Sequence, residues 1–334
     1  MKILVLGGTK FIGPHVVRGL AALGHEVTIF HRGETETQLP ANVRHVHGDF
    51  SSFPDHIEEL RKLSPEVVLD MVPFRAEDAE RLKSFKGVAR RVVAISSGDV
   101  YRAFGRIWGT EPGPPDPVPL TEDSPLREKL STAGLDYNKT AIERALRNDP
   151  DLTTTIIRAP ATHGPGDPQH RLFQYIKRMD EKRPAVLLER RLANWQWSRG
   201  YVENVAHAIV LAVTDNRAAS RVYNVADPIA FTEADWVRHI GHVIGWQGDV
   251  ISASSEQLPA SFNHNLDLNQ QYVVDSTRIR RELGYAEVVP FEEGLRRTIE
   301  WERANPPADK APERFDYAAE DAALAKLRPK VENE

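Results

Sequence analysis

The first thirteen residues, MKILVLGGTKFIG, constrain the fold of this chain more than any other stretch. Residues 2–6 are a short run of apolar strand formers, and glycines follow at positions 7, 8 and 13. Apolar residues between 16 and 23 then recur at helical spacing until Gly24, and a second strand is expected over 25–30. A strand, a glycine turn, a helix and a second strand form the βαβ unit whose helix N-terminus binds a dinucleotide pyrophosphate.

Two basic residues bear on the choice of dinucleotide. Residue 10, where the usual three-glycine spacing has its second glycine, is a lysine. Lys10 is either a solvated loop residue or a positive charge beside the cofactor. NAD sites carry an acid after the second strand for the ribose 2′-hydroxyl, whereas a basic residue suits a 2′-phosphate. Arg32 stands near that place and the first acid is Glu34, so we predict NADP as the favoured cofactor and NAD as the alternative. The predicted contacts of this turn and strand end are Gly7, Thr9, Lys10, Phe11, Ile12, Gly13 and Arg32.

Composition excludes several classes of protein. A chain of 334 residues with 41% hydrophobic content can bury a large core, in one large or two interleaved domains. It has no apolar run of membrane-spanning length and no signal peptide, so we expect a cytoplasmic protein without a membrane partner. The absence of cysteine excludes disulfides and thiolate sites. A net charge of −5 argues against a dedicated nucleic-acid-binding protein. The twelve histidines are scattered without persuasive metal-ligand spacing, so no metal site is predicted.

Strand and helix patterns alternate through the first half of the chain, as in a parallel sheet with crossover helices. We predict strands over 44–47, 67–71, 91–96 and 153–158 and helices over 53–63, 76–85 and 139–147. Residues 105–128 are rich in proline and glycine, and we predict a functional loop without regular structure there.

Several motifs, spread nearly end to end, carry a resemblance to a known family. They are the Gly7 turn, Gly48-Asp49, Ser97 before Val100-Tyr101, Arg158 through Gly164-Pro165-Gly166, Arg199-Gly200-Tyr201-Val202, Tyr223-Asn224-Val225, and Asp275 through Leu283-Gly284-Tyr285 to Gly294-Leu295 with Trp301. In this order they resemble the extended short-chain dehydrogenases, which include the NAD(P)-dependent epimerases and dehydratases of nucleotide sugars. The glycine turn with the later His31-Arg32-Gly33 resembles an atypical branch, related to chloroplast stem-loop binding proteins.

The resemblance implies an α/β fold: a doubly wound parallel sheet (Rossmann) with a smaller C-terminal substrate-binding domain. We expect residues 1–165 plus about 200–226 to form the dinucleotide-binding domain. Residues 166–199 plus about 227–302 would form the substrate-binding domain, followed by a charged C-terminal tail over 303–334. It also implies further cofactor contacts from Asp49, Phe50, Val72 and Lys139.

The catalytic residues implied by the resemblance are Ser97, Tyr137 and Lys139. Family members pair a tyrosine and a lysine four residues apart on one helix, with a Ser or Thr at the end of the preceding strand. Position 135 is leucine, however, and Tyr137 lies only two residues before Lys139. Residues two apart on a helix point to roughly opposite sides, so Tyr137 faces the nicotinamide only if the helix begins after it, with Asn138 as its N-cap. Otherwise Tyr137 has only a packing role, or the chain has lost the catalytic tyrosine of the family. The alternative for Ser97 is that its hydroxyl caps a loop.

The second half should supply the substrate site. We predict contacts from His163, His170, Arg171, Trp197 and Arg199, because aromatic faces and arginine suit a nucleobase and a diphosphate. The alternatives are a core or interface role for the tryptophan and a solvated helix start for His170-Arg171.

The function implied is that of an NAD(P)-dependent epimerase, dehydratase or reductase acting on a nucleotide sugar or a related alcohol or carbonyl compound. A homodimer is left open. The competing hypothesis is a non-catalytic or RNA-associated cofactor-binding protein on the same fold.

Overall fold

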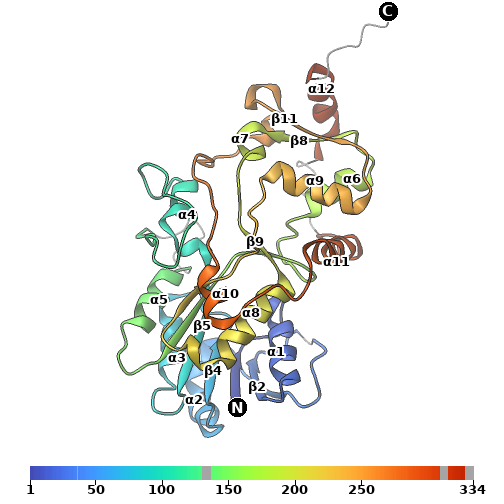
Figure 1. The fold of residues 1–334 in the computed structure, drawn as a ribbon. Helices are drawn as coiled ribbons and strands as arrows, with labels where there is room; N and C mark the ends of the chain where they lie inside the picture. The colour runs from blue at the N-terminus through green and yellow to red at the C-terminus, as the bar shows by residue number, and fades with distance from the viewer. Residues whose placement is uncertain (36, 130–136, 309–314, 328–334) are drawn as a thin grey trace, which may run out of the picture.

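The centre of the protein is a seven-stranded, entirely parallel sheet with the order β10-β6-β5-β4-β1-β2-β3. The computed structural model describes residues 1–35, 37–129, 137–308 and 315–327. The chain enters in the middle of the sheet and winds outward to both edges, so the predicted doubly wound α/β fold is confirmed (Figure 1). The strands are β1 (Lys2–Leu6), β2 (Glu26–His31), β3 (Arg44–His47), β4 (Val67–Asp70), β5 (Arg91–Ser97), β6 (Thr154–Ala159) and β10 (Val222–Asn224).

Helices cover both faces of this sheet because the strands are apolar on both sides. One face carries α1 (Ile12–Ala22), α8 (Val202–Thr214) and α10 (Thr277–Leu283); the other carries α2 (Phe53–Lys62), α3 (Ala79–Lys83) and α5 (Lys139–Arg147). Helices α1 and α8 pack closely at Gly19, where a Cβ would lie 3.0 Å from a Val210 methyl group. The two faces together bury the main core of the protein.

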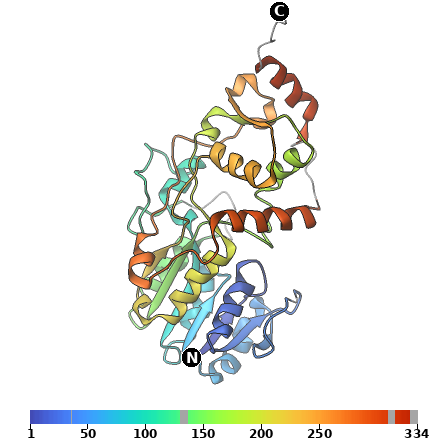
Figure 2. The same cartoon turned by 45° about the vertical axis from the view of Figure 1, so that its right-hand side comes forward.

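A smaller unit lies beyond the carboxyl ends of the strands (Figures 1 and 2). Its core joins α6 (Phe173–Asp180), α7 (Arg190–Ala193), α9 (Glu233–Ile244) and α11 (Phe291–Ala304) to a two-stranded parallel sheet of β8 (Ala185–Glu189) and β11 (Asp249–Ala253). A second parallel pair, β7 (Ala161–His163) and β9 (Arg199–Tyr201), lies between the two units.

The segment after residue 303 contains a packed helix, α12 (Tyr317–Leu327). Ala323 and Leu324 are buried against β8 and its neighbours, and the buried Glu320 lies 2.6 Å from Arg178 of α6. This part of the expected charged tail therefore belongs to the smaller unit. None of the described helices has the length and apolar character needed to cross a membrane.

The prediction that residues 105–128 lack regular structure is wrong at its first three positions. Helix α4 (Arg102–Ile107) extends into this range, because Ala103 and Ile107 are buried in an apolar cluster and Arg106 pairs with Asp116 further along the loop. Residues 108–128 contain no helix, and their only β-type pairings are isolated bridges.

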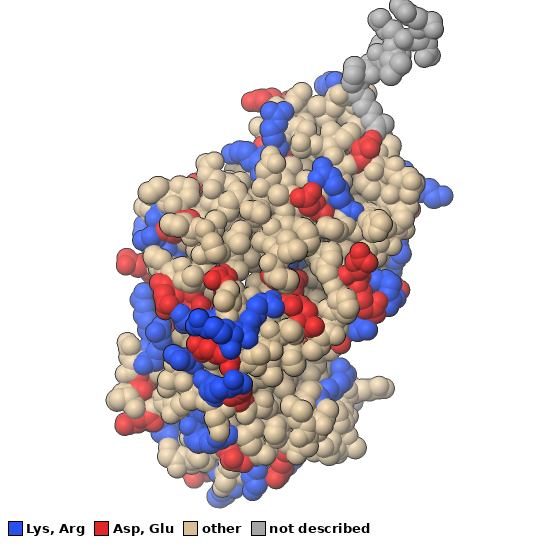
Figure 3. Space-filling view, in the orientation of Figure 1, with Lys and Arg blue, Asp and Glu red and all other residues tan. Residues whose placement is uncertain are grey.

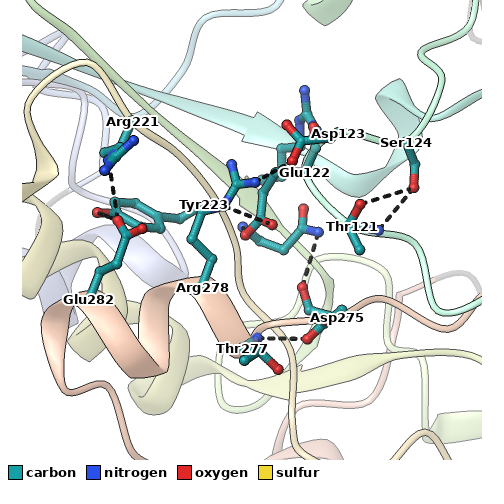
Figure 4. A network of polar contacts seen from close by, with 12 residues as sticks. Thr121, Glu122, Asp123, Ser124, Arg221, Tyr223, Asp275, Thr277, Arg278 and Glu282 are labelled. Carbon is teal, nitrogen blue, oxygen red and sulfur yellow. Dashed lines mark hydrogen bonds and ion pairs between the residues drawn. The ribbon is translucent and has the colours of Figure 1, made fainter.

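Hydrogen bonds and ion pairs connect the end of the loop over residues 108–128 to the edge of the sheet (Figure 4). Glu122 accepts a hydrogen bond from the backbone N–H of Asn224 at 3.0 Å and lies 3.4 Å from Arg278 of α10. Arg278 also pairs with Asp123 at 2.5 Å, and the Asn224 side chain donates to the carbonyl oxygen of Asp275. The loop is thereby held at the β10 edge, beside the carboxyl ends of the strands.

A buried polar network joins β5, β6 and α5. Arg158 and Glu143, each about 1% exposed, form an ion pair at 2.7 Å. Glu143 also accepts from the Ser96 hydroxyl at 2.6 Å, while Arg158 donates to the Tyr101 hydroxyl at 2.9 Å. Tyr101 in turn donates to Asn224. Because every member has a partner, the network fixes α5 and the strand ends relative to one another.

We predict that Glu143→Gln destabilises the protein strongly, because it leaves the buried Arg158 guanidinium without a compensating charge. Breaking a buried pair from one side costs about 3–5 kcal/mol, which urea unfolding can measure. The control is Glu300→Gln, which breaks an exposed pair with Arg296 and should leave the unfolding midpoint nearly unchanged. An equal, small effect of both substitutions would contradict the proposed role of the network.

Candidate active site

A cleft of about 1020 Å³ opens at the carboxyl ends of β1, β2, β4 and β5. This volume lies at the upper end of the roughly 300–1,000 Å³ of small-molecule sites, and the location is the one at which open α/β sheets bind ligands. We call it the glycine-turn cleft. Its lining includes every residue of 7–13, residues 31–35 and 49–51, and parts of 71–81, with Ile95 at its β5 end.

The glycine turn requires its glycines for different reasons. Gly7 and Gly8 have φ angles of 86° and 95°, which L side chains rarely adopt. A Cβ on Gly13 would lie 2.5 Å from the backbone carbon of Gly8, so only glycine allows helix α1 to begin against the end of β1. As a result the N-terminal end of α1, where the backbone favours anions, lines the cleft.

The predicted adenosine-side residues lie in the same cleft. Lys10, Arg32, Asp49 and Phe50 all line it, as does Val72 after β4. The Arg32 side chain is about half exposed, and its Nη2 lies 3.2 Å from Glu34. The hydroxyl and backbone N–H of Ser51 donate to Asp49 and hold the pKa of that carboxyl below its usual value.

Sequence reasoning missed the residues of α3 that close the cleft. Arg81 lies over the Phe50 ring at 4.6 Å and pairs with Asp70 at 3.1 Å. Asp70 is fully buried, and burial raises its pKa despite the guanidinium. Asp70, an acid at the end of an apolar strand, could have indicated from the sequence that a basic partner lies nearby. That this partner is Arg81 could not be identified without the fold.

The three predicted catalytic residues gather near the end of β5. Helix α5 begins at Lys139, and the Asn138 side chain accepts a hydrogen bond from the Ala141 backbone N–H, so Asn138 is the N-cap as predicted. Tyr137 therefore precedes the helix. Its phenol reaches back to the turn after Ser97, where the Ser97 hydroxyl accepts from the Asp99 backbone N–H.

Tyr137 forms a hydrogen bond with Asp99, which was not among the predicted site residues. Its hydroxyl donates to Asp99 Oδ2 at 2.5 Å. Burial, and then the Asp99 carboxylate, raise the pKa of Tyr137 well above its ordinary value, against a smaller opposite effect of Ser97. Tyr137 is consequently a protonated hydrogen-bond donor at neutral pH. Asp99 stands two residues after Ser97, and only the fold brings it opposite Tyr137.

Lys139 is buried next to the cleft, with 5% of its surface exposed, and does not line it. Its Nζ donates at 2.9 Å to the carbonyl oxygen of Ile95, the β5 residue that does line the cleft. Burial lowers the pKa of Lys139. The Phe74 ring, on the cleft wall, lies 4.8 Å from this ammonium group and 6.1 Å from the Tyr137 ring. Phe74 thus borders both the cleft and the group of catalytic candidates.

A buried arginine is a further missed member of this group. Arg127, at the end of the loop, is 2% exposed, and its Nη2 lies 4.0 Å from Asp99 Oδ1. Nε and Nη2 of Arg127 and Oδ1 of Asp99 have no hydrogen-bond partner among the residues that the structure describes. The group therefore has unused donors and an unused acceptor beside Tyr137.

The predicted substrate residues fall into two places. His163 and Arg199 lie on the paired strands β7 and β9. His163 is 1% exposed, and burial lowers its pKa to about 3, so it is neutral. Arg199 is buried against Glu233 and lies over the Trp197 ring at 5.5 Å.

The second place is the segment before α6. His170 stacks on Trp301 and lies 2.7 Å from the buried Glu302, while Arg171 lies 2.6 Å from Asp167. All these side chains have partners within the chain, and their contact with a substrate stays a prediction.

Three of the twelve histidines lie close together in the structure, so the expectation that the histidines are scattered is wrong for these three. His31, His45 and His47 come together on adjacent strands, where each can place one ring nitrogen within 4.8 Å of the others. His31 is 14 and 16 residues away from the other two in the sequence, and it comes next to them only through the pairing of β2 with β3. The sequence alone therefore did not reveal the group.

The fold and the cleft agree with the result of comparison with known families. The chain belongs to the NAD dependent epimerase/dehydratase family, whose model matches residues 3–226. Such proteins bind NAD(P) through the βαβ unit described above.

Individual relatives are distant. The chain is 25% identical over 264 residues to 2′-dehydrokanamycin reductase of Streptomyces kanamyceticus, covering 77% of this chain and 70% of the relative. It is 27% identical over 238 residues to the chloroplast stem-loop binding protein of 41 kDa b of Arabidopsis thaliana, covering 67% of this chain and 58% of the relative. Among solved structures, a UDP-glucose 4-epimerase of Thermotoga maritima with UDP-glucose aligns with a TM-score of 0.69 at 20% identity, covering 92% of this chain and all of that chain.

Proposed function

We propose that this protein is an NAD(P)-dependent oxidoreductase that transfers a hydride between a nicotinamide dinucleotide and a hydroxyl or carbonyl group of a nucleotide sugar or a related small molecule. The observation that carries the proposal is the glycine-turn cleft, which meets the Ser97, Tyr137 and Lys139 group at Ile95. Family membership supports the reaction class, and the reductase and epimerase relatives support a sugar-derived substrate. An epimerase, a dehydratase and a reductase would each use this arrangement for the hydride-transfer step.

The residues of the cleft fit a dinucleotide. The backbone of residues 7–13 with Thr9, Phe11 and Ile12 would hold the pyrophosphate at the start of α1. Arg32, Lys10, Asp49 and Phe50 would surround the adenosine, and Val72 and Lys139 would lie toward the nicotinamide ribose. The bound nicotinamide supplies the hydride acceptor or donor.

Proton transfer is the part of the reaction that the chain itself must perform. A Tyr137 phenolate next to the Asp99 carboxylate is unfavourable, because the two negative charges would share a buried site. We therefore assign a relay: during oxidation a substrate hydroxyl gives its proton to Tyr137 Oη while the Tyr137 proton passes to Asp99 Oδ2. The relay runs in reverse during reduction. No phenolate forms, and Asp99 ends protonated.

The competing hypothesis is a non-catalytic or RNA-associated cofactor-binding protein on the same fold, and the similarity to a stem-loop binding protein supports it. On the face shown in Figure 3, basic side chains lie among acidic ones, which does not favour a phosphate backbone over other partners.

The experiment that separates the two hypotheses is an assay of enzymatic turnover. Purified protein is mixed with NAD(P) or NAD(P)H and a panel of UDP- and dTDP-sugars, and nicotinamide absorbance and sugar products are followed. Cofactor binding without any redox change or sugar conversion would favour the alternative.

We predict that Tyr137→Phe lowers kcat by about 10²- to 10⁴-fold, the usual contribution of a general acid–base group, while dinucleotide affinity stays nearly unchanged. Asp99→Asn should also lower kcat, because it removes the group that receives the Tyr137 proton, and the activity that remains should lose its alkaline limb at lower pH, because a carboxylate that raises the pKa of Tyr137 is gone. Tyr317→Phe, on α12 far from the cleft, is the matched control. Full activity of Tyr137→Phe would contradict the relay.

We also predict that NADP binds more tightly than NAD and that Arg32→Asp removes or reverses this preference. A charge-assisted contact with the 2′-phosphate corresponds to about ten-fold or more in affinity. Calorimetric titration of both cofactors tests this, with Arg44→Asp, on the neighbouring strand, as a charge-matched control. Equal affinity of the wild-type protein for NAD and NADP would refute the prediction.

A further inference from the structure

Three histidines form a compact group at the edge of the large sheet. His31 of β2 stands opposite His47 of β3 in the strand register, and His45 precedes His47 by two residues. Because side chains alternate along a strand, His45 and His47 project to the same face. That is the α1 face, since the intervening Val46 belongs to the core of the opposite face. The His31 ring centre lies 5.1 Å from that of His45 and 4.8 Å from that of His47.

We propose that His31, His45 and His47 form a binding site for a divalent transition-metal ion such as Zn²⁺, with one ring nitrogen from each as ligand. Imidazole nitrogens are ligands that Zn²⁺, Cu²⁺ and Ni²⁺ prefer. In the part of the chain that the structure describes, this is the one group of three that can place its ligand atoms so close together, within 4.8 Å. Nothing in the proposed oxidoreductase reaction requires this group, so the site is a separate property of the chain.

The spacing suits a tetrahedral ion. Zn–N bonds of about 2.0–2.1 Å at tetrahedral angles place ligand nitrogens about 3.3–3.4 Å apart. Nε2 of His31 and Nδ1 of His45 are already 2.9 Å apart, so a shift of a few tenths of an ångström makes room for the ion between them. His31 is 5% exposed, whereas His45 and His47 are exposed. An ion held there keeps a coordination position open to water or to an anionic ligand.

Binding requires one rearrangement of a proton. In the structure His31 Nδ1 accepts a hydrogen bond from the Gly33 backbone N–H at 3.1 Å, so Nε2 carries the proton that is directed at His45. Coordination through Nε2 transfers this proton to Nδ1, and the Gly33 amide must turn away. Gly33 has a φ angle of 81° and no side chain to hinder this. Since residues 31–33 also line the glycine-turn cleft, the ion would lie at its adenosine end.

The test is a zinc titration of protein from which any purification tag has been removed, in competition with a chromophoric chelator. We expect one Zn²⁺ per chain. The double variant His45→Gln/His47→Gln should bind Zn²⁺ weaker by more than the roughly 10- to 100-fold that outer-shell changes cost. The matched control is His242→Gln/His264→Gln, which removes two exposed histidines elsewhere and should bind as the wild type does.

Two further readouts separate loss of the site from loss of the fold. Without metal, the His45/His47 variant should melt at the temperature of the wild type, and only the wild type and the control should gain thermal stability when Zn²⁺ is added. X-ray absorption of the loaded protein should show imidazole nitrogens at about 2.0–2.1 Å. Equal zinc affinity in the His45/His47 variant, or no stoichiometric binding by the wild type, would overturn the proposal.

Discussion

The contact between Gly13 and the backbone of Gly8 is the constraint on which the rest of the site depends. There is no room for a side chain between them, since a Cβ on Gly13 would overlap three backbone atoms of Gly8. The close approach lets α1 begin directly above the end of β1 and turns its free N–H groups toward the cleft. The parallel sheet then brings the ends of β2, β4 and β5 to the same edge, so that residues as far apart in the sequence as Gly7 and Ile95 line one cavity.

The part of the fold around the glycine turn was predictable because its signals are local. A glycine turn between a strand and a helix, and the Asn138 cap before Lys139, each lie within a few consecutive residues, and the predicted helix over 139–147 is the observed α5. Hydrophobic periodicity does not depend on distant parts of the chain, and the order of the elements then restricts the sheet to few topologies.

The parts that were not predictable depend on contacts between distant residues. Asp99 and Tyr137 are 38 positions apart, and Arg127 reaches them from the end of a loop that has almost no regular structure. The histidine group requires the register of β2 with β3. Helix α12 is stabilised by the buried pair of Glu320 with Arg178, more than 140 residues away, which no charge pattern within the segment reveals. In each case the residue types were visible in the sequence, whereas their partners were not.

Binding of a nicotinamide dinucleotide in the glycine-turn cleft can be tested by fluorescence titration of the wild-type protein and of Gly13→Ala with NADH and NADPH. We expect the wild-type protein to bind both, and Gly13→Ala, although folded by circular dichroism, to lose measurable affinity because the turn cannot keep its shape. Gly24→Ala, at the other end of α1, serves as control for backbone strain: Gly24 has a φ angle of 77° but open space around it, so the variant should be somewhat less stable and should retain binding. Wild-type affinity in a folded Gly13→Ala protein would show that the dinucleotide binds elsewhere, and would contradict the account.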